Sequence, residues 1–219
     1  MKKKLCPAME KFPKRKKERA EAIAQGLKEL YPDAVCALEF EGDPFRLLVM
    51  ARLSAQCTDK RVNEVSRDLF RRYPNVRAFA EAELSQLEEA VRPCGLFRTK
   101  AKQIHEMSRT LLEKYGGKVP DKKPDLLALP GVGEKIANLM MGDVFGDPHI
   151  VADTHCIRLS GRWGLTKSEN PAIVTRELEK LVKKEEQSDF CHRLITLGRE
   201  HCRAVNPHCD TCPLRKDAE

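Results

Sequence analysis

The sequence predicts an all-α fold, and three observations favour it. Apolar residues recur at three- and four-residue spacing through most of the chain, which is the period of a helix with one buried face. No segment combines alternating apolar residues with the turn signals of a β-hairpin, and no internal repeat is present. The 219 residues are 41% hydrophobic but only 5% aromatic, so they suffice for one domain or two small ones with a mainly aliphatic core.

The N-terminal half begins with a basic segment. Residues 1–19 are lysine-rich and contain two prolines, so we expect a basic arm. A first helix is predicted from Lys14 to Leu30, where apolar residues recur at helical spacing. A second begins at Asp43 and Pro44, a capping residue followed by proline at the first helical position. This second helix is apolar nearly all round, which predicts a central core helix.

Further helices follow in order. Thr58 or Asp59 can cap the next helix. Two short helices are predicted within residues 76–92, and a longer one over residues 99–115, ended by two glycines. The basic residues at the start of this longer helix are expected to meet phosphate or water: Arg98, Lys100 and Lys102. Beyond residue 153 the apolar spacing predicts three more helical segments.

The segment Leu129–Asp153, with the sequence LPGVGEKIANLMMGDVFGDPHIVAD, carries the strongest functional signal. A proline and two glycines, Gly131 and Gly133, interrupt it, so we predict a short helix, a glycine hairpin and a second helix. Both glycines allow positive φ and a close approach of the backbone to a partner. The amides of Val132, Gly133 and Glu134 are expected to lack partners at the helix N-terminus, which favours an anion such as a DNA phosphate.

Two ionisable residues of this segment suit covalent chemistry. Lys135 lies in the first turn of the second helix, where the positive end of the dipole disfavours a cation and so favours a neutral, nucleophilic amine. Asp153 follows a Gly-Asp-Pro turn, and we expect the returning chain to bring its carboxylate beside Lys135. Each residue alone is common on protein surfaces, but their occurrence together with the hairpin is specific.

These runs resemble one family. LPGVGEKIAN followed by VADTH, the run SAQ-x-TD at residues 54–59, and Gly-Leu-aromatic-x-x-Lys-Ala at residues 95–101 are similar to the endonuclease III branch of helix-hairpin-helix DNA glycosylases. The resemblance spans about Leu38 to Pro213 and implies two helical lobes with the active cleft between them. One lobe contains the middle helices, and the other contains the N-terminal helix and the C-terminal helices.

The resemblance also implies a role for individual residues. Lys135 is the amine that attacks C1′ of the damaged nucleotide, and Asp153 is the essential carboxylate. Gln56 enters the duplex beside the extruded nucleotide, and Leu96 fills the stack opposite the lesion, as apolar wedges do in proteins that expel a base.

The expected organisation follows the same pattern. In order, it comprises a basic arm (1–19), an N-terminal helix packing with the C-terminal lobe (20–37), a middle helical lobe (38–128), the hairpin with its second helix (129–145), a C-terminal helical lobe (146–201), and a cysteine loop with its tail (202–219).

Three cysteines near the C-terminus form C-x6-C-x2-C: Cys202, Cys209 and Cys212. Such short loops ligate iron–sulfur clusters. The family closes its [4Fe–4S] site with a fourth cysteine, but this chain has Ala218 at that position. We expect a metal-bound loop, with these alternatives open: a cluster completed by Asp217 or Cys6, a zinc site completed by His201 or His208, or a loop without metal.

Composition and resemblance together lead to a function. Net charge +7 and a pI of about 8.9 fit a polyanionic partner. No apolar run approaches the roughly 18 residues of a membrane span, and no leader resembles a signal peptide. Nine cysteines, an odd number, argue against a disulfide framework, so we expect a reducing cytoplasm.

The resemblance implies a bifunctional DNA glycosylase and apurinic/apyrimidinic lyase that acts, as a monomer, on oxidised pyrimidines in double-stranded DNA. Two alternatives remain open. A monofunctional, adenine-specific glycosylase would lack the lysine. A non-enzymatic DNA-binding protein would use the hairpin only as a phosphate clamp and would need neither Lys135 nor Asp153.

Overall fold

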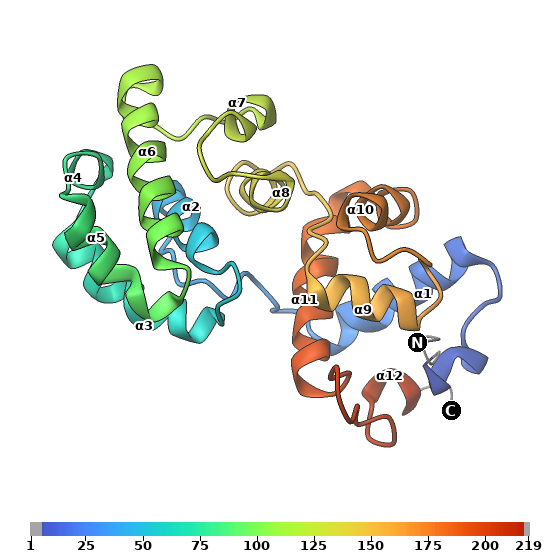
Figure 1. Cartoon of the computed structure of the whole chain (residues 1–219). Helices are drawn as coiled ribbons and strands as arrows, with labels where there is room; N and C mark the ends of the chain where they lie inside the picture. Colours follow the sequence, from blue (N-terminus) through green and yellow to red (C-terminus); the bar gives the residue numbers. More distant parts are fainter. Residues whose placement is uncertain (1–5, 217–219) are drawn as a thin grey trace. The chain divides into compact units, whose positions relative to one another are not determined.

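The computed structural model of the chain describes residues 6–216. Within that range the chain is helical and contains no strand, so the predicted all-α class is confirmed (Figure 1). The chain forms two compact units: a middle unit, Cys36–Gly146, and a terminal unit, Met1–Val35 with Asp147–Glu219. None of the described helices combines the length and the apolar composition that a membrane span requires.

The middle unit contains seven α-helices and one short 3-10 helix in its described residues. They are α2 (Pro44–Leu53), α3 (Asp59–Arg72), α4 (Val76–Ala80), α5 (Leu84–Val91), η2 (Arg92–Cys94), α6 (Phe97–Tyr115), α7 (Lys123–Leu127) and α8 (Glu134–Asp143). In the terminal unit the described elements are η1 (Pro7–Lys11), α1 (Lys16–Leu30), α9 (Thr154–Arg162), α10 (Pro171–Glu179), η3 (Lys184–Glu186), α11 (Gln187–Glu200) and α12 (Pro213–Lys216).

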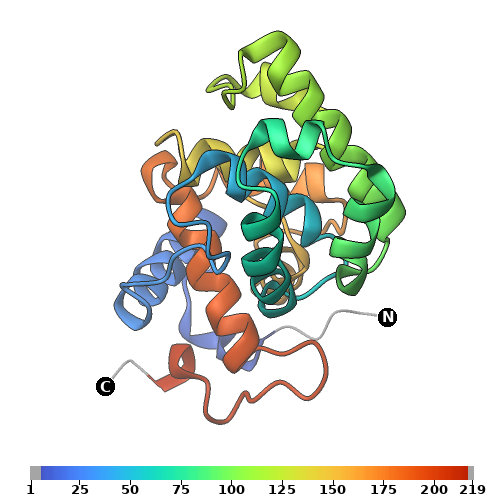
Figure 2. The same ribbon diagram turned by 90° about the vertical axis from the view of Figure 1, so that its left-hand side faces the viewer.

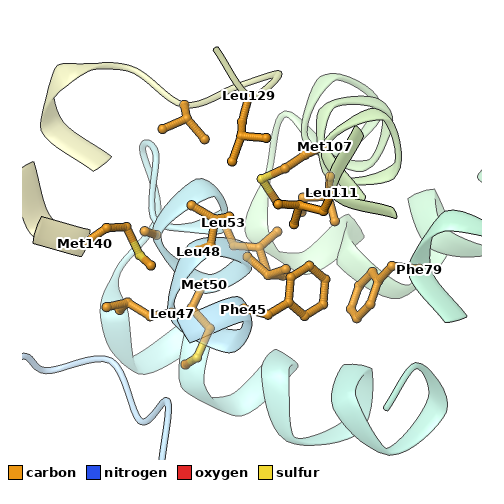
Figure 3. Close-up of a cluster of buried hydrophobic side chains, with 14 of the residues drawn as sticks. Phe45, Leu47, Leu48, Met50, Leu53, Phe79, Met107, Leu111, Leu129 and Met140 are labelled. Atoms are coloured by element: carbon orange, nitrogen blue, oxygen red, sulfur yellow. The ribbon is translucent and has the colours of Figure 1, made fainter. Parts of the chain in front are cut away.

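Helix α2 is the centre of the middle unit, as its apolar sequence predicted. Of its ten residues, seven are buried. Figure 3 shows Phe45 of α2 beside Phe79 of α4, with ring centroids 5.4 Å apart in an edge-to-face arrangement. Side chains from α6, α8 and the hairpin complete the cluster around α2: Met107, Leu111, Leu129 and Met140.

Local capping fixes where α2 and α3 begin. The carboxylate of Asp43 accepts hydrogen bonds from the amides of Phe45 at 2.8 Å and Arg46 at 3.2 Å, so the predicted cap is confirmed. Of the two candidates for α3, Thr58 is the cap, and its hydroxyl accepts from the amide of Arg61 at 3.3 Å. These bonds satisfy amides that the first turn of a helix leaves without intrahelical partners.

Helix α6 begins two residues before its predicted start, at Phe97 rather than Thr99. It ends as predicted at two glycines, Gly116 with φ 59° and Gly117 with φ 80°. The amide of Gly117 donates to the carbonyl of Leu111 at 2.9 Å, which closes the last turn.

In the terminal unit, α11 packs against α1 and α9 (Figure 1). The buried side chains on these three helices include Ala20, Ile23, Leu27, Leu159, Phe190, Leu194 and Leu197. Arg193 of α11 is also buried, and its guanidinium donates to the carboxylate of Asp189 at 2.8 Å and to the carbonyl of Tyr31 at 3.3 Å. The charged group is therefore paired, as burial requires.

The N-terminal segment contains structure that its lysine-rich composition did not predict. Within residues 1–19, expected as an arm, Pro7–Lys11 forms η1. Helix α1 (Lys16–Leu30) confirms the helix predicted from Lys14 to Leu30 and begins two residues later. The element η1 lies beside α12 and contacts it (Figures 1 and 2). The described N-terminal residues therefore belong to the folded terminal unit.

Candidate functional site

Helix α7, a glycine turn and α8 form the predicted helix-hairpin-helix unit. Gly131 has φ 78°, in the left-handed region that favours glycine. A Cβ at this position would lie 3.0 Å from Cβ of Gln103 and 3.1 Å from Cδ of Arg52. These two side chains are joined by a hydrogen bond of 2.5 Å from Arg52 Nε to Gln103 Oε1. The hairpin therefore approaches α2 and α6 as closely as backbone alone permits.

Two details of the predicted hairpin were wrong. Gly133 has φ −106° and ψ 179°, so this N-cap of α8 needs no left-handed conformation, and a Cβ there would meet nothing within 4 Å. The amide of Val132 is not free but donates to the carbonyl of Leu129 at 3.1 Å, and the Val132 side chain is buried. In the first turn of α8, Glu134 retains an amide without an intrahelical partner. Fewer amides are therefore available to an anion at the start of α8 than the three that the sequence predicted.

Lys135 lies in the first turn of α8, as predicted, and its side chain is exposed. Next to it, the carboxylate of Glu134 pairs with the ammonium of Lys123 at 2.8 Å, which joins the starts of α7 and α8. Glu134 therefore has a cationic partner other than Lys135. The Lys123–Glu134 ion pair stabilises the hairpin turn, and the amine of Lys135 beside it is accessible to a ligand.

Asp153 is the N-cap of α9 in the terminal unit, following the buried residues Val151 and Ala152. Its Oδ1 accepts a hydrogen bond from the amide of Cys156 at 2.7 Å, which orients the half-buried carboxylate. Because Asp153 and Lys135 belong to different units, their pairing stays a prediction.

The two residues expected to enter DNA share an unusual backbone conformation. Gln56 has φ 53° and Leu96 has φ 46°, two of the four positive values among the described non-glycine residues. Both side chains are exposed, Leu96 to 56%. A left-handed conformation costs a non-glycine residue roughly 1–2 kcal/mol, so the surrounding fold must hold these two side chains outward. Their insertion into DNA stays a prediction.

Lys100 does not meet phosphate or water, contrary to the prediction. Its side chain is fully buried, and the ammonium donates to the carbonyl of Cys94 at 2.7 Å and to the carbonyl of Leu53 at 2.8 Å. Burial lowers the pKa of this ammonium. Leu53 ends α2 shortly before Gln56, and Cys94 ends η2 shortly before Leu96. The sequence did not reveal this role, because a basic residue in a helix is usually solvated.

The three cysteines of the C-terminal loop lie together at one small cavity. Cys6, Pro7, His201 and His208 also border it. Burial raises the pKa of the Cys212 thiol to about 11, and proximity to the thiols of Cys6, Cys202 and Cys209 raises it as well. In the sequence, Cys6 is far from the loop, yet in the structure it is a neighbour. Asp217 and Ala218, considered above, lie outside the described residues.

Comparison with known proteins agrees with this architecture. A family model described as "HhH-GPD superfamily base excision DNA repair protein" matches residues 49–184. An "Endonuclease III" of Synechocystis sp. is 43% identical over 200 residues, which cover 91% of this chain and 91% of that protein.

Two solved structures are similar over nearly the whole chain. One is described as the structure of a non-covalent endonuclease III–DNA complex, with a TM-score of 0.87, 40% identity and coverage of 90% of this chain and 92% of that chain. The other, a trapped endonuclease III–DNA covalent intermediate, has a TM-score of 0.86, 40% identity and coverage of 90% and 93%. The resemblance noted in the sequence is therefore confirmed: the chain belongs to the HhH-GPD superfamily of base excision DNA repair proteins and, within it, to the endonuclease III family.

Proposed function

We propose that the chain is a bifunctional DNA glycosylase and apurinic/apyrimidinic lyase that removes oxidised pyrimidines from double-stranded DNA. The observation that carries this proposal is the exposed Lys135, presented in the first turn of α8 by a braced glycine hairpin. Similarity to a trapped covalent protein–DNA intermediate supports a covalent mechanism. A DNA clamp without enzymatic activity would need no such amine.

DNA is held first through its backbone. The start of α8 offers amides and the positive end of the helix dipole to a phosphate, a contact that positions the duplex without reading its sequence. Gln56 and Leu96, both exposed and both left-handed, fill the space left when the damaged nucleotide leaves the stack. The net charge of +7 adds sequence-independent attraction.

The chemistry then follows from an amine and a carboxylate. The lone pair of the Lys135 amine forms a bond to C1′, the bond from C1′ to the base breaks, and the base departs with its electron pair and takes up a proton. Asp153 receives the proton that the amine loses, or stabilises the positive charge that develops on the sugar. The sugar ring then opens: the nitrogen lone pair forms the C1′=N bond, the C1′–O4′ bond breaks, and O4′ takes up a proton. The resulting Schiff base permits loss of a C2′ proton and cleavage of the C3′–O bond, so β-elimination cuts the strand on the 3′ side.

We assign an iron–sulfur cluster to the C-terminal loop on the basis of family membership and of the three thiols gathered at one cavity. Thiolates are the usual protein ligands of such clusters. Cys202, Cys209 and Cys212 would hold it, as a structural and DNA-contacting element with no part in bond breaking. Nine cysteines, an odd number, suit a reducing compartment, and we propose that the chain acts there as a monomer on damaged or abasic duplex DNA.

Borohydride trapping tests the nucleophile. Wild-type protein incubated with abasic duplex and borohydride should form a covalent adduct, because reduction of the Schiff base makes it permanent. Lys135→Gln should form none. Lys114→Gln is the control, an exposed lysine in the last turn of α6 and outside the hairpin, and this variant should be trapped like wild type. Equal trapping of Lys135→Gln and wild type would move the nucleophile elsewhere, for example to an N-terminal amine.

A further inference from the structure

A fourth cysteine borders the cavity at which the three loop cysteines lie. Cys6 shares it with Cys202, Cys209 and Cys212, whereas the position of the family's fourth cysteine is occupied by Ala218. We propose that Cys6 supplies the fourth thiolate of the cluster, so that segments from both ends of the chain close the site together. This inference rests on the cluster assigned under the proposed function.

The fold holds Cys6 in place through its backbone. The amide of Cys6 donates to the carbonyl of Arg162, the last residue of α9, at 2.9 Å. The carbonyl of Cys6 accepts from the amide of Met9 at 2.9 Å, which forms the first turn of η1. Because η1 packs against α12, which directly follows Cys212, the two cysteine-bearing segments are joined outside the cavity as well.

Arg162 connects the two sides of the cavity. Besides receiving the amide of Cys6 at its carbonyl, it directs Nη1 to Sγ of Cys202 at 3.2 Å. The same guanidinium donates to the carbonyls of Arg203 at 2.7 Å and Ala204 at 3.1 Å, which fixes the start of the cysteine loop. A donor to a ligand sulfur orients that sulfur and tunes a cluster by hydrogen bonding. Arg162 therefore positions both Cys6 and Cys202.

The arrangement suits a cluster more than a single ion. Across residues 6–216, no three histidine, cysteine, aspartate or glutamate side chains form a group that could hold one metal ion. A four-iron cluster presents a separate iron to each thiolate, so its ligands surround a volume instead of meeting at a point. Four cysteines around one cavity fit that requirement. Each thiol loses its proton when it binds, so cluster assembly releases protons.

Two histidines at the same cavity are the competing ligands. His201 and His208 border it, and the Nδ1 atom of His201 is buried without a hydrogen-bond partner. The thiol of Cys6 is the better match, because thiolates bind such clusters far more commonly than imidazoles do. Variants of Cys6 and His201 therefore separate the two possibilities.

Iron content and visible absorbance provide the first test. Protein purified without oxygen and reconstituted with ferrous iron and sulfide should carry about four irons per chain and absorb broadly in the visible. Cys6→Ala should lose at least one iron and bleach in air several-fold faster than wild type. His201→Ala should retain iron, and so should Cys36→Ala, a control cysteine in the middle unit. Restoring the family pattern with Ala218→Cys in the Cys6→Ala background should return both iron content and air stability.

Thiol labelling tests wild-type protein directly, so the result does not depend on the folding of a variant. In the iron-loaded chain, Cys6 should resist alkylation together with Cys202, Cys209 and Cys212. Once iron is stripped under native conditions by a chelator and an oxidant, followed by mild reduction of the thiols, all four should react. Mass spectrometry of the digested protein reads each site separately.

Several results would overturn the proposal: free alkylation of Cys6 in the iron-loaded chain, full iron in Cys6→Ala, loss of iron in His201→Ala, stoichiometric zinc in place of iron, or failure of wild type to take up iron. Borohydride trapping of the wild type is scored independently. A protein that traps abasic DNA but keeps its iron without Cys6 refutes only this inference. A protein that needs Cys6 for iron but traps no DNA refutes only the proposed catalysis.

Discussion

The ammonium of Lys100 donates to the carbonyl of Cys94 at 2.7 Å from a fully buried position. Its second bond, to Leu53 at 2.8 Å, joins the ends of η2 and α2. Gln56 follows one of these ends and Leu96 follows the other, and both have positive φ. One buried cation thus connects the two segments whose exposed residues are proposed to enter DNA.

Replacing this cation tests the connection. Lys100→Met keeps most of the buried methylene stem but leaves two carbonyls without a donor, and each buried unsatisfied group costs about 1–3 kcal/mol. We expect the free energy of unfolding in urea to fall by about 3 kcal/mol, with weaker binding to lesion DNA. Lys102→Met, on the exposed side of the same helix, is the matched control and should change stability by less than about 0.5 kcal/mol. Equal stability of the two variants would show that Lys100 does not hold these segments.

The strained conformation of Leu96 predicts opposite effects on stability and function. Leu96→Gly removes the wedge and relieves a left-handed backbone, so we expect stability to rise by up to about 1 kcal/mol while lesion binding and excision fall. Leu96→Ala removes the wedge but keeps the strain, so excision should fall without the gain in stability. Thermal unfolding and single-turnover excision measure the two effects. Unchanged excision in both variants would remove Leu96 from the DNA contact.

Asp153 is both the proposed catalytic carboxylate and the N-cap of α9, so a substitution that keeps the cap can test its catalytic role alone. Asn is as good an N-cap as Asp, so Asp153→Asn should keep the bond to the amide of Cys156 and the stability of wild type. Loss of the charge should slow single-turnover excision by about 100-fold or more, since positive charge develops on the sugar in the transition state. Binding to lesion DNA should remain within a few-fold of wild type. Excision at the wild-type rate would exclude a catalytic role.

Changing each hairpin glycine to Ala should affect stability and DNA binding differently. Gly131→Ala forces a side chain into the left-handed region and against Arg52 and Gln103, which should cost about 1–3 kcal/mol of stability. Gly133→Ala meets open space and extended backbone, so the folded state should tolerate it. If a phosphate approaches there, Gly133→Ala should weaken binding equally on damaged and undamaged duplex. A loss confined to damaged DNA would mean that the hairpin reads the lesion.

Alkaline pH should destabilise the middle unit through Cys36. Burial raises the pKa of this thiol from about 9 to about 12, and the carboxylate of Asp143 contributes. Because the folded state keeps a proton that the unfolded state loses, stability is complete below the unfolded pKa and falls as pH rises toward 12. Between pH 7 and pH 10 the loss from this thiol is about 1.4 kcal/mol. Urea titrations at both pH values should show a smaller loss in Cys36→Ser, whose hydroxyl does not ionise in this range. Identical pH dependence would refute the effect.

Local signals in the sequence were sufficient wherever neighbouring residues complete the structure by themselves. Asp43 accepts from amides two and three residues later, and Gly116 ends α6 with its own left-handed backbone, so both boundaries were predictable. The hairpin was predictable for the same reason. Even there, which glycine needs positive φ was decided by packing, because only Gly131 faces the Arg52 and Gln103 side chains.

Tertiary structure decided the features that depend on residues far apart in the chain. The sequence predicts that Lys100 is a surface cation, but in the structure α2 and η2 place two carbonyls beside its ammonium. In the sequence Cys6 was one of several candidate fourth ligands. The fold brings it to the loop, where its amide donates to the carbonyl of Arg162 and the Arg162 guanidinium donates to the sulfur of Cys202. Hydrophobic spacing and capping involve residues only a few positions apart, so they can be recognised in the sequence. A lysine becomes buried and bonded to two carbonyls only when distant segments pack around it. The same holds for thiols that meet at one cavity.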